Sequence, residues 1–336
     1  MKTKHQNIFF IFGLLLLAVM VYLLDFKQVW DGLQHAGYWF FAVILLWAFL
    51  YLFNVTTWYL ILRSQDQGQQ PRPSDAVRYM WLYKVTVSGF ALNYATPGGL
   101  MGGEPYKIME LSPVVGTERA SSSVILHTMT HIFSHFWFWL LSVVLFVATK
   151  PVNLPIGCLL GLTTLFCLLG IWFFQKGYHS GLANRIMRLL TYIPFVKRWA
   201  QPFIAKHKEQ LDTIDTQIAA LHSQKRRTFV AGVMLELACR VASALEIFFI
   251  LNVLEVQPNF LDCILILAFT SLLANLLFFL PMQLGGREGG FLLFTTAIGL
   301  TTSAGAFVAL IVRIRELVWT GIGLLLIKVE RKKQKQ

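Results

Sequence analysis

The residues best placed to do chemistry are two glutamates, each at the end of the same short pattern. Residues 97–104 and 281–288 both read P-x-x-L-x-G-x-E, and each stretch lies between two apolar runs. The carboxylates of Glu104 and Glu288 can bind a cation, a protonated amine or a proton. The backbone amides freed where a helix starts again suit a phosphate oxygen. Together the two stretches predict a site for a lipid headgroup with an anionic phosphate and a polar or amine end.

Glycines and cations in and beside both stretches complete this candidate site. Arg287 and Lys107 are expected to add contacts to the phosphate. The competing interpretation is structural: the glycines allow close helix packing, and each glutamate caps the backbone amides of its own break. The predicted substrate-binding residues here are Pro97, Gly98, Gly99, Gly102, Gly103, Glu104, Lys107, Pro281, Gly285, Gly286, Arg287 and Glu288.

Further charges interrupt the apolar runs of the second half of the chain. A lone charge at the middle of a membrane costs roughly 2.5–3.5 kcal/mol on insertion scales, so each should have a partner. Glu236 and Arg240 stand four residues apart, which predicts an ion pair on one helix. Glu246 has no such partner in its own run, and Arg313 or Arg315 could answer it, or Glu288, from the last run.

Three histidines, His127, His131 and His135, share one face of a predicted helix because they are spaced by four. They could bind a metal ion or relay protons. No acidic ligand accompanies them at that spacing, and histidines on adjacent turns are poorly arranged for one ion. A polar face toward a cavity is therefore favoured, and no metal or cofactor is expected. The predicted intramembrane polar support is Glu236, Arg240, Glu246, His131 and Arg315.

Composition explains what must position these residues. The chain has 336 residues, of which 56% are hydrophobic and 14% charged. Several apolar runs reach the roughly 20 residues that cross a bilayer as a helix. The sequence therefore predicts an all-α, polytopic membrane helix bundle, with residues 1–336 as a single integral membrane domain. The net charge of +12 collects in loops between spans, as the positive-inside rule expects, so no nucleic-acid partner is predicted.

The expected membrane segments follow from the apolar runs and from loop charge. Residues 175–228 are basic and amphipathic, and are predicted to form a cytoplasmic helical insert on an anionic leaflet; a solvated helical hairpin is the alternative. Lysines near both ends of the chain place the N- and C-termini in the cytoplasm. Predicted full spans lie at about residues 8–24, 38–62, 120–148, 155–174, 229–254 and 304–327.

Two hairpins between these spans contain the glutamate breaks. Residues 38–148 form a predicted first repeat with its break at 96–104, and residues 229–327 form a second with its break at 280–288. Loop charge makes the hairpins re-entrant or broken helices that dip in from opposite faces, as in an inverted repeat with a site near the midplane. The alternative is that both apolar pairs simply cross the membrane twice.

At these two breaks the chain resembles the lysylphosphatidylglycerol synthase transmembrane-region family, a family of flippase-like membrane proteins. The resemblance rests on residues 97–104 and 281–288, is extended by residues 289–291 and Arg313, and covers essentially the whole chain. It adds Arg313 to the predicted substrate-binding residues. The sequence departs from the family pattern at Met101, which is inserted, and at Met282 and Gln283, where small residues are usual.

The resemblance implies lipid translocation between leaflets of the cell (inner) membrane. The expected substrates are anionic or aminoacylated phospholipids, glycolipids or polyprenyl lipids. Because the chain ends eight residues after Lys328, we expect a stand-alone member without a synthase domain, and hence no enzyme activity.

Two other classes of function remain open. One is a membrane glycosyltransferase acting on polyprenyl-phosphate sugars, with Asp25 and Asp31 as its acidic pair. These two residues are six apart in a short loop, which fits that class poorly. The other is a non-transporting scaffold subunit. The sequence also leaves a homo-oligomer open.

Overall fold

The computed structural model describes residues 30–31, 34–66, 73–95, 102–176, 226–254, 258–277 and 285–333. Within these ranges the chain is almost entirely helical and contains no strand, which confirms the all-α membrane bundle. The long helices are α3 (Tyr38–Ser64), α6 (Thr117–Thr149), α7 (Leu154–Lys176), α11 (Arg226–Val253) and α14 (Thr302–Lys333). The short ones are η1 (Pro73–Ala76), α4 (Tyr79–Ala95), α5 (Gly103–Val115), α12 (Phe260–Leu276) and α13 (Gly286–Ala297).

Three helices of the described ranges, α3, α6 and α7, are both long enough and apolar enough to cross a membrane. Helices α11 and α14 have 28 and 32 residues, enough for a bilayer at 1.5 Å per residue, but they carry charged residues in their apolar runs. Helix α11 nearly coincides with the predicted span at 229–254, and α14 extends beyond the predicted span at 304–327. That both cross the membrane stays a prediction. Their buried charged residues are Glu236, Glu246, Arg313, Arg315 and Glu316. The predicted span at 8–24 lies outside the described residues, as does nearly all of the insert at 175–228.

Each predicted break separates two short helices. Helix α4 ends at Ala95 and α5 begins at Gly103, while α12 ends at Leu276 and α13 begins at Gly286. None of these four helices exceeds 17 residues, less than a full crossing needs. Both new helices start with a glutamate in their first turn, where a negative charge is favoured by the helix dipole.

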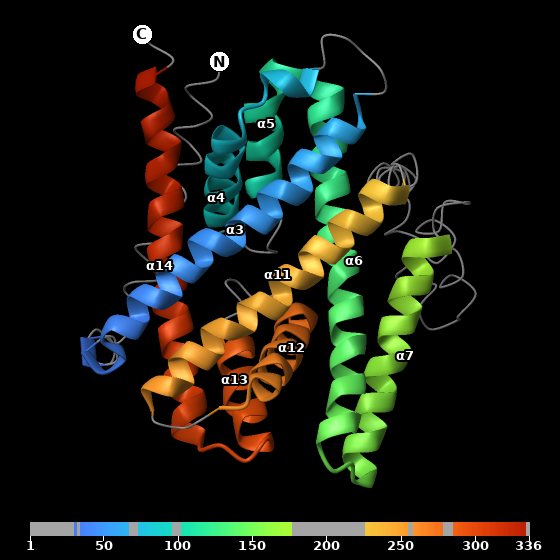
Figure 1. Cartoon of the computed structure of the whole chain (residues 1–336), viewed down its shortest axis with the longest axis vertical. Coiled ribbons are helices and arrows are strands. Elements are labelled where there is room, and N and C mark those ends of the chain that lie inside the picture. Colours follow the sequence, from blue (N-terminus) through green and yellow to red (C-terminus); the bar gives the residue numbers. More distant parts are fainter. Residues whose placement is uncertain are drawn as a thin grey trace, which may run out of the picture.

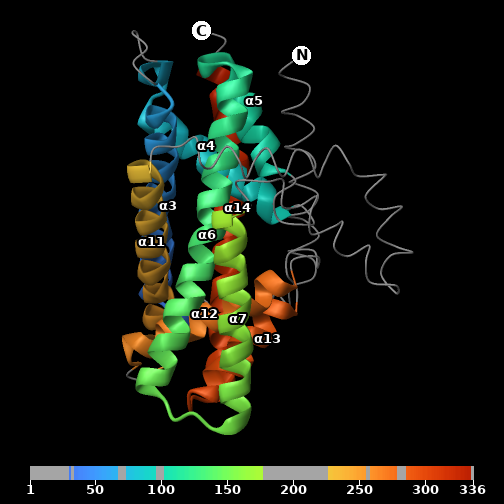
Figure 2. The same ribbon diagram turned by 90° about the vertical axis from the view of Figure 1, so that its right-hand side faces the viewer.

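The two short-helix pairs lie at opposite ends of the bundle, as two views agree (Figures 1 and 2). Helices α3 and α11 run antiparallel and make the most extensive contact in the described chain. Exchanging α3, α4, α5 and α6 for α11, α12, α13 and α14 maps the observed contacts among these eight helices onto one another; for example, α4 with α14 becomes α12 with α6. An inverted repeat would require this pattern, and the repeat itself stays a prediction.

Small residues let helices of different segments approach closely. A Cβ added to Gly103 would lie 2.1 Å from the carbonyl oxygen of Gly89, so α5 contacts α4 backbone to backbone. A Cβ on Gly323 would lie 2.7 Å from the carbonyl oxygen of Val87, and the Ser88 hydroxyl donates to the Gly323 carbonyl at 3.0 Å. Helix α14 is therefore packed tightly against α4.

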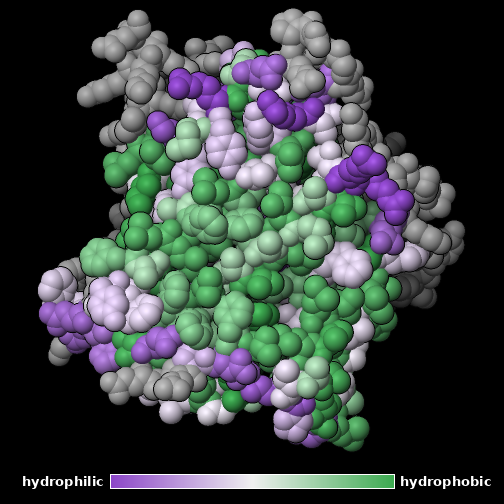
Figure 3. Space-filling model, in the orientation of Figure 1, coloured by the Kyte–Doolittle hydropathy of each residue, from purple (hydrophilic) through white to green (hydrophobic). Residues whose placement is uncertain are grey.

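The outer surface is suited to lipid. Figure 3 shows a broad hydrophobic band across the middle of one face, with hydrophilic residues toward its upper and lower edges. Large apolar side chains are exposed on the long helices, among them Phe41, Leu45, Val144, Leu162 and Leu169. An exposed apolar surface of this size is expected of a membrane protein and unusual for a water-soluble monomer.

Candidate functional site

The second break holds Glu288 through both of its carboxylate oxygens. Gly285, with a φ of +81°, turns the chain into α13, a backbone conformation that glycine adopts at little cost. Its amide donates to Glu288 Oε2 at 2.9 Å, so the glutamate caps its own helix. The other oxygen, Oε1, accepts from the guanidinium of Arg313 on α14. Glu288 is thus a capping residue and part of an interhelical ion pair at once.

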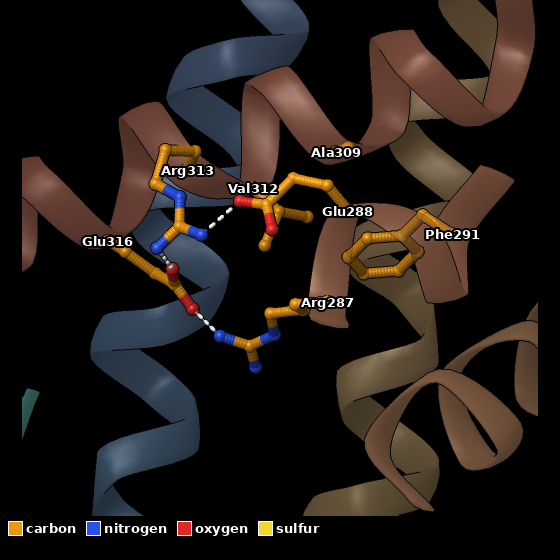
Figure 4. A pocket seen from close by; sticks show the side chains of 7 residues that line it. All are labelled: Arg287, Glu288, Phe291, Ala309, Val312, Arg313 and Glu316. Carbon is orange, nitrogen blue, oxygen red and sulfur yellow. Dashed lines mark hydrogen bonds and ion pairs between the residues drawn. The ribbon is translucent and has the colours of Figure 1, made fainter. Parts of the chain in front are cut away.

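From Arg313 a network of charges continues through the bundle (Figure 4). Arg313 also donates to the hydroxyl of Tyr94, on α4, and that hydroxyl donates to Glu316. The remaining carboxylate oxygen of Glu316 accepts from Arg287. The network therefore joins α13, α14 and α4, and it brings the second break into contact with the last turn before the first break.

The charges of this network balance, with two arginines against two glutamates. Arg313 and Glu316 are buried, with side chains 7% and 1% exposed, whereas those of Arg287 and Glu288 are 26% and 33% exposed. Breaking such a buried pair by removing one partner typically costs about 3–5 kcal/mol. Arg287 and Glu288 are therefore partly accessible, and the buried Arg313 and Glu316 hold them in position.

A small pocket lies among these side chains. It is lined by Arg287, Glu288, Phe291, Ala309, Val312, Arg313 and Glu316 (Figure 4). The ion pairs fill it so closely that no water-sized sphere fits between them. Any molecule that binds among these side chains must therefore replace one or more of their internal contacts.

Behind the pocket, Arg315 and Glu246 form a bidentate pair, with nitrogen–oxygen distances of 2.7 and 3.1 Å. The guanidinium carbon of Arg315 also lies 3.9 Å from the centre of the Trp47 ring. Both charged side chains are almost completely buried. The prediction that Glu246 or Glu288 finds its partner on the last helix is confirmed for both: Arg315 pairs with Glu246, and Arg313 pairs with Glu288.

The first break holds Glu104 differently. Asn93, at the end of α4, donates to Glu104 Oε1 at 3.0 Å and accepts from the Gly103 amide at 2.7 Å. The Gly103 amide is therefore capped by Asn93, and the alternative that Glu104 caps amides of its own break concerns residues 96–101, which lie outside the described ones. Lys107 lies 3.5 Å from the same Oε1, and its stem packs against Gly89. The second oxygen, Oε2, is buried without a hydrogen-bond partner in the described chain.

Not all of the predicted site residues can be placed. Pro97, Gly98, Gly99 and Pro281 lie outside the described residues. Among the placed ones, Gly102 and Gly103 begin α5 beside Glu104, Gly285 and Gly286 begin α13, and Arg287 and Arg313 meet in the charged pocket.

The sequence reasoning missed three residues that complete the two sites. Asn93 and Tyr94 immediately precede the first break, and polar side chains at the end of an apolar run were a signal for both. Glu316 is three residues after Arg313, a spacing that places the two on one helix face. Arg313 Nη1 and Glu316 Oε2 are 3.6 Å apart.

A second polar cluster joins α6 and α11. Glu236 accepts at Oε2 from His131 Nδ1 over 2.8 Å, while Arg240 donates to the Ser134 hydroxyl at 3.1 Å and the His131 carbonyl at 3.0 Å. The predicted direct Glu236–Arg240 ion pair is therefore wrong, because partners on the facing helix displace it. No group of three metal-ligating side chains occurs among the described residues.

Fold and site define a class: a polytopic helical membrane protein with two broken-helix pairs that meet at a buried charge network. The family model for the lysylphosphatidylglycerol synthase TM region matches residues 10–323, nearly the whole chain, and the protein belongs to that family. No curated protein and no solved structure matches the chain. Membership makes it a membrane protein of a lipid-related family.

Proposed function

We propose that this protein moves a polar lipid headgroup between the leaflets of the cell membrane, as a flippase-like transporter without catalytic activity. Its substrate would be an anionic or aminoacylated phospholipid, or a polyprenyl lipid. The headgroup would pass the charged pocket at the second break and the glutamate of the first break. Both termini would face the cytoplasm.

The observation that carries the proposal is the closed network of Arg287, Glu288, Arg313 and Glu316. Each internal ion pair resembles the contact that a headgroup would make. A phosphate can replace a carboxylate on the arginines, in the bidentate geometry that guanidinium groups favour. An amine or hydroxyl can replace an arginine on Glu288 or Glu316. Exchange of internal for external partners would keep every buried charge satisfied during passage.

The first break would supply the second contact surface. Glu104 Oε2 is a buried acceptor without a partner in the described chain, and an acceptor of this kind is costly unless something donates to it. Tyr94 and Asn93 are neighbours in sequence at the end of α4; Tyr94 contacts Glu316 of the charge network and Asn93 contacts Glu104. A headgroup leaving one site would therefore be close to the other.

The arrangement of the helices supports alternating access. The two pairs lie at opposite ends of the bundle and are linked through α14 by Tyr94 and Arg287. Inverted-repeat transporters form their sites on such discontinuous helices, near the midplane. In this proposal, residues 38–148 and 229–327 are the two repeats that rock against each other around the network.

The test is headgroup accessibility in proteoliposomes. Vesicles would contain labelled phosphatidylglycerol, aminoacyl-phosphatidylglycerol, phosphatidylethanolamine or a polyprenyl phosphate, and the rate at which the inner pool becomes reachable from outside is measured. We expect acceleration of at least one lipid, with about a tenfold or greater loss in E288Q and R313Q, since roughly 1.4 kcal/mol of lost binding at the barrier suffices. Acceleration that is equal in wild type and both variants would overturn the assignment of the site.

A matched control is the ion pair between Lys150 and Asp262, at 2.9 Å. It also links two helices, α6 and α12, but it lies outside the network. The variant D262N should transport at the wild-type rate. No acceleration of any lipid, together with sugar transfer lost in D25N and D31N, would instead indicate the glycosyltransferase; without either activity the scaffold function would stand.

A further inference from the structure

The cluster between α6 and α11 contains two buried acceptors that face each other. Glu236 Oε1 and His127 Nε2 are 3.9 Å apart, and neither has a hydrogen-bond partner in the described chain. Their side chains are 1% and 6% exposed. A buried polar atom without a partner is uncommon in proteins and needs a physical reason.

The protonation state of His127 explains why this contact is open. Because His127 Nε2 makes no hydrogen bond in the described chain, we assign the proton of the neutral ring to Nδ1. In the neutral ring a donating Nδ1 leaves Nε2 as an acceptor. An ionised Glu236 also offers only acceptors. One proton between the two atoms would turn this gap into a hydrogen bond, with a contraction from 3.9 Å to about 2.8 Å.

A route for that proton is present on the other side of the same carboxylate. His131 Nδ1 is 2.8 Å from Glu236 Oε2, and the His131 side chain is 40% exposed. The half-exposed imidazole of His131 is thus hydrogen-bonded to the buried carboxylate of Glu236, which in turn faces the buried imidazole of His127. Histidine exchanges protons near neutral pH, which suits it to this order of groups.

The charged and titratable groups around the cluster are few. Helix α6 adds His135, whose ring centre is 5.2 Å from that of His131, and α11 adds Arg240 and Cys239. Helix α5 contributes Lys107, which acts electrostatically on His127 and lies 5.8 Å from the centre of the Trp58 ring. The same Trp58 ring packs against His127, with ring centres 5.9 Å apart.

From this geometry we infer that Glu236, His127 and His131 form a proton-binding site, separate from the charged pocket at the second break. One proton enters at His131 and is held between Glu236 Oε1 and His127 Nε2. The added positive charge repels Lys107, which is also the partner of Glu104. Resting on the proposed function, proton binding therefore acts on the first break and makes translocation sensitive to a pH gradient.

The site itself is tested without any lipid movement. The full chain, with isotope-labelled histidine, is placed in lipid nanodiscs, and the ring resonances are followed between about pH 5 and pH 8. We expect the His127 and His131 resonances to change over one shared interval, with assignments from H127Q and H131Q. In E236Q the shared interval should disappear, because the carboxylate that joins the two rings no longer binds a proton.

The control is H135Q, which removes the neighbouring imidazole on the same face and should leave the shared interval in place. Separate titration of His127 and His131 in the wild type, or an unchanged shared interval in E236Q, would overturn the proton site. If E236Q is not monodisperse in size-exclusion chromatography, H131Q replaces it. In H131Q the His127 resonance should then stop responding within the same interval.

A second arm separates the proton site from the transport proposal. Proteoliposomes with and without an imposed pH gradient are compared for the rate of headgroup exposure. Wild type and H135Q should respond to the gradient, and H127Q should lose most of that response. A wild-type transport rate that does not change with the gradient would overturn only the coupling between proton binding and transport. No transport by the wild type would contradict the proposed function, and the proton site would then be judged by the resonance test alone.

Discussion

The two breaks share one sequence pattern but hold their glutamates with different partners. Glu104 is held within its own helix pair, by Asn93 on α4 and Lys107 on α5. Glu288 reaches out of its pair to Arg313 on α14, and the network continues to Tyr94 on α4. The duplicated pattern therefore fixes where a carboxylate stands, and the packing of the surrounding helices decides what it binds. A change at the second break should disturb three helices, and one at the first only two.

The largest effect is expected from R313Q. This change leaves Glu288 and Glu316 without a shared cation and Tyr94 without its donor, inside a site where unpaired charge is costly. We expect a loss of about 3–5 kcal/mol in the free energy of unfolding. Denaturant unfolding of the purified protein in detergent measures it. The matched change at the first break, K107Q, should cost less than half as much, and equal losses would contradict the distinction between a shared and a local network.

A smaller effect is expected from Y94F, which keeps the aromatic ring against Phe90 and removes only the hydroxyl. That hydroxyl contacts both Arg313 and Glu316, and hydrogen bonds to charged groups contribute about 1.5–3 kcal/mol. The control is Y83F, whose hydroxyl donates to the neutral Ala48 carbonyl at 2.9 Å. In thermal unfolding, the melting temperature of Y94F should be clearly lower than that of Y83F. The reverse order would contradict the role of Tyr94 in the network.

Close packing at the first break is tested with G103A. The new methyl group would meet the Gly89 carbonyl and the Asn93 side chain, so α4 and α5 must separate, at about 1–3 kcal/mol. At the second break, G286A meets only the flexible Leu277 side chain and should cost less. G289A meets nothing within 4 Å and serves as the control. The melting temperature should be lowest for G103A, intermediate for G286A and highest for G289A. A G103A variant as stable as the wild type would show that α4 and α5 can separate at no cost.

The smallest effect on stability is expected from E104Q. The amide oxygen of glutamine can still accept from Asn93, so only the 3.5 Å contact to Lys107 is lost. We expect the free energy of unfolding to fall by about 1 kcal/mol, in the range of a single hydrogen bond. The double variant E104Q/K107Q sharpens this point, because a cost well below the sum of the two single changes would show that the residues are coupled.

The sequence predicted the helices and both breaks because apolar runs, glycines and prolines are local signals. It also predicted that Arg313 or Arg315 would be a partner of Glu246 or Glu288, since unpaired charges in apolar runs need partners; which arginine pairs with which glutamate came from the structure. It failed for Glu236, where spacing on one helix suggested Arg240 and the observed partner, His131, comes from α6. Tyr94 was missed for the same reason: its contact with Glu316 joins residues 222 positions apart, which only the packing of α4 against α14 can bring together.

The packing of Gly323 against Val87 has a mechanical consequence. Arg313 and Gly323 are ten residues apart on one helix, about 15 Å at 1.5 Å per residue. Helix α14 is therefore held at two points, by the ion pair in the charged pocket and by the close backbone contact with α4. A displacement of α14 along its axis would therefore act on both contacts at once.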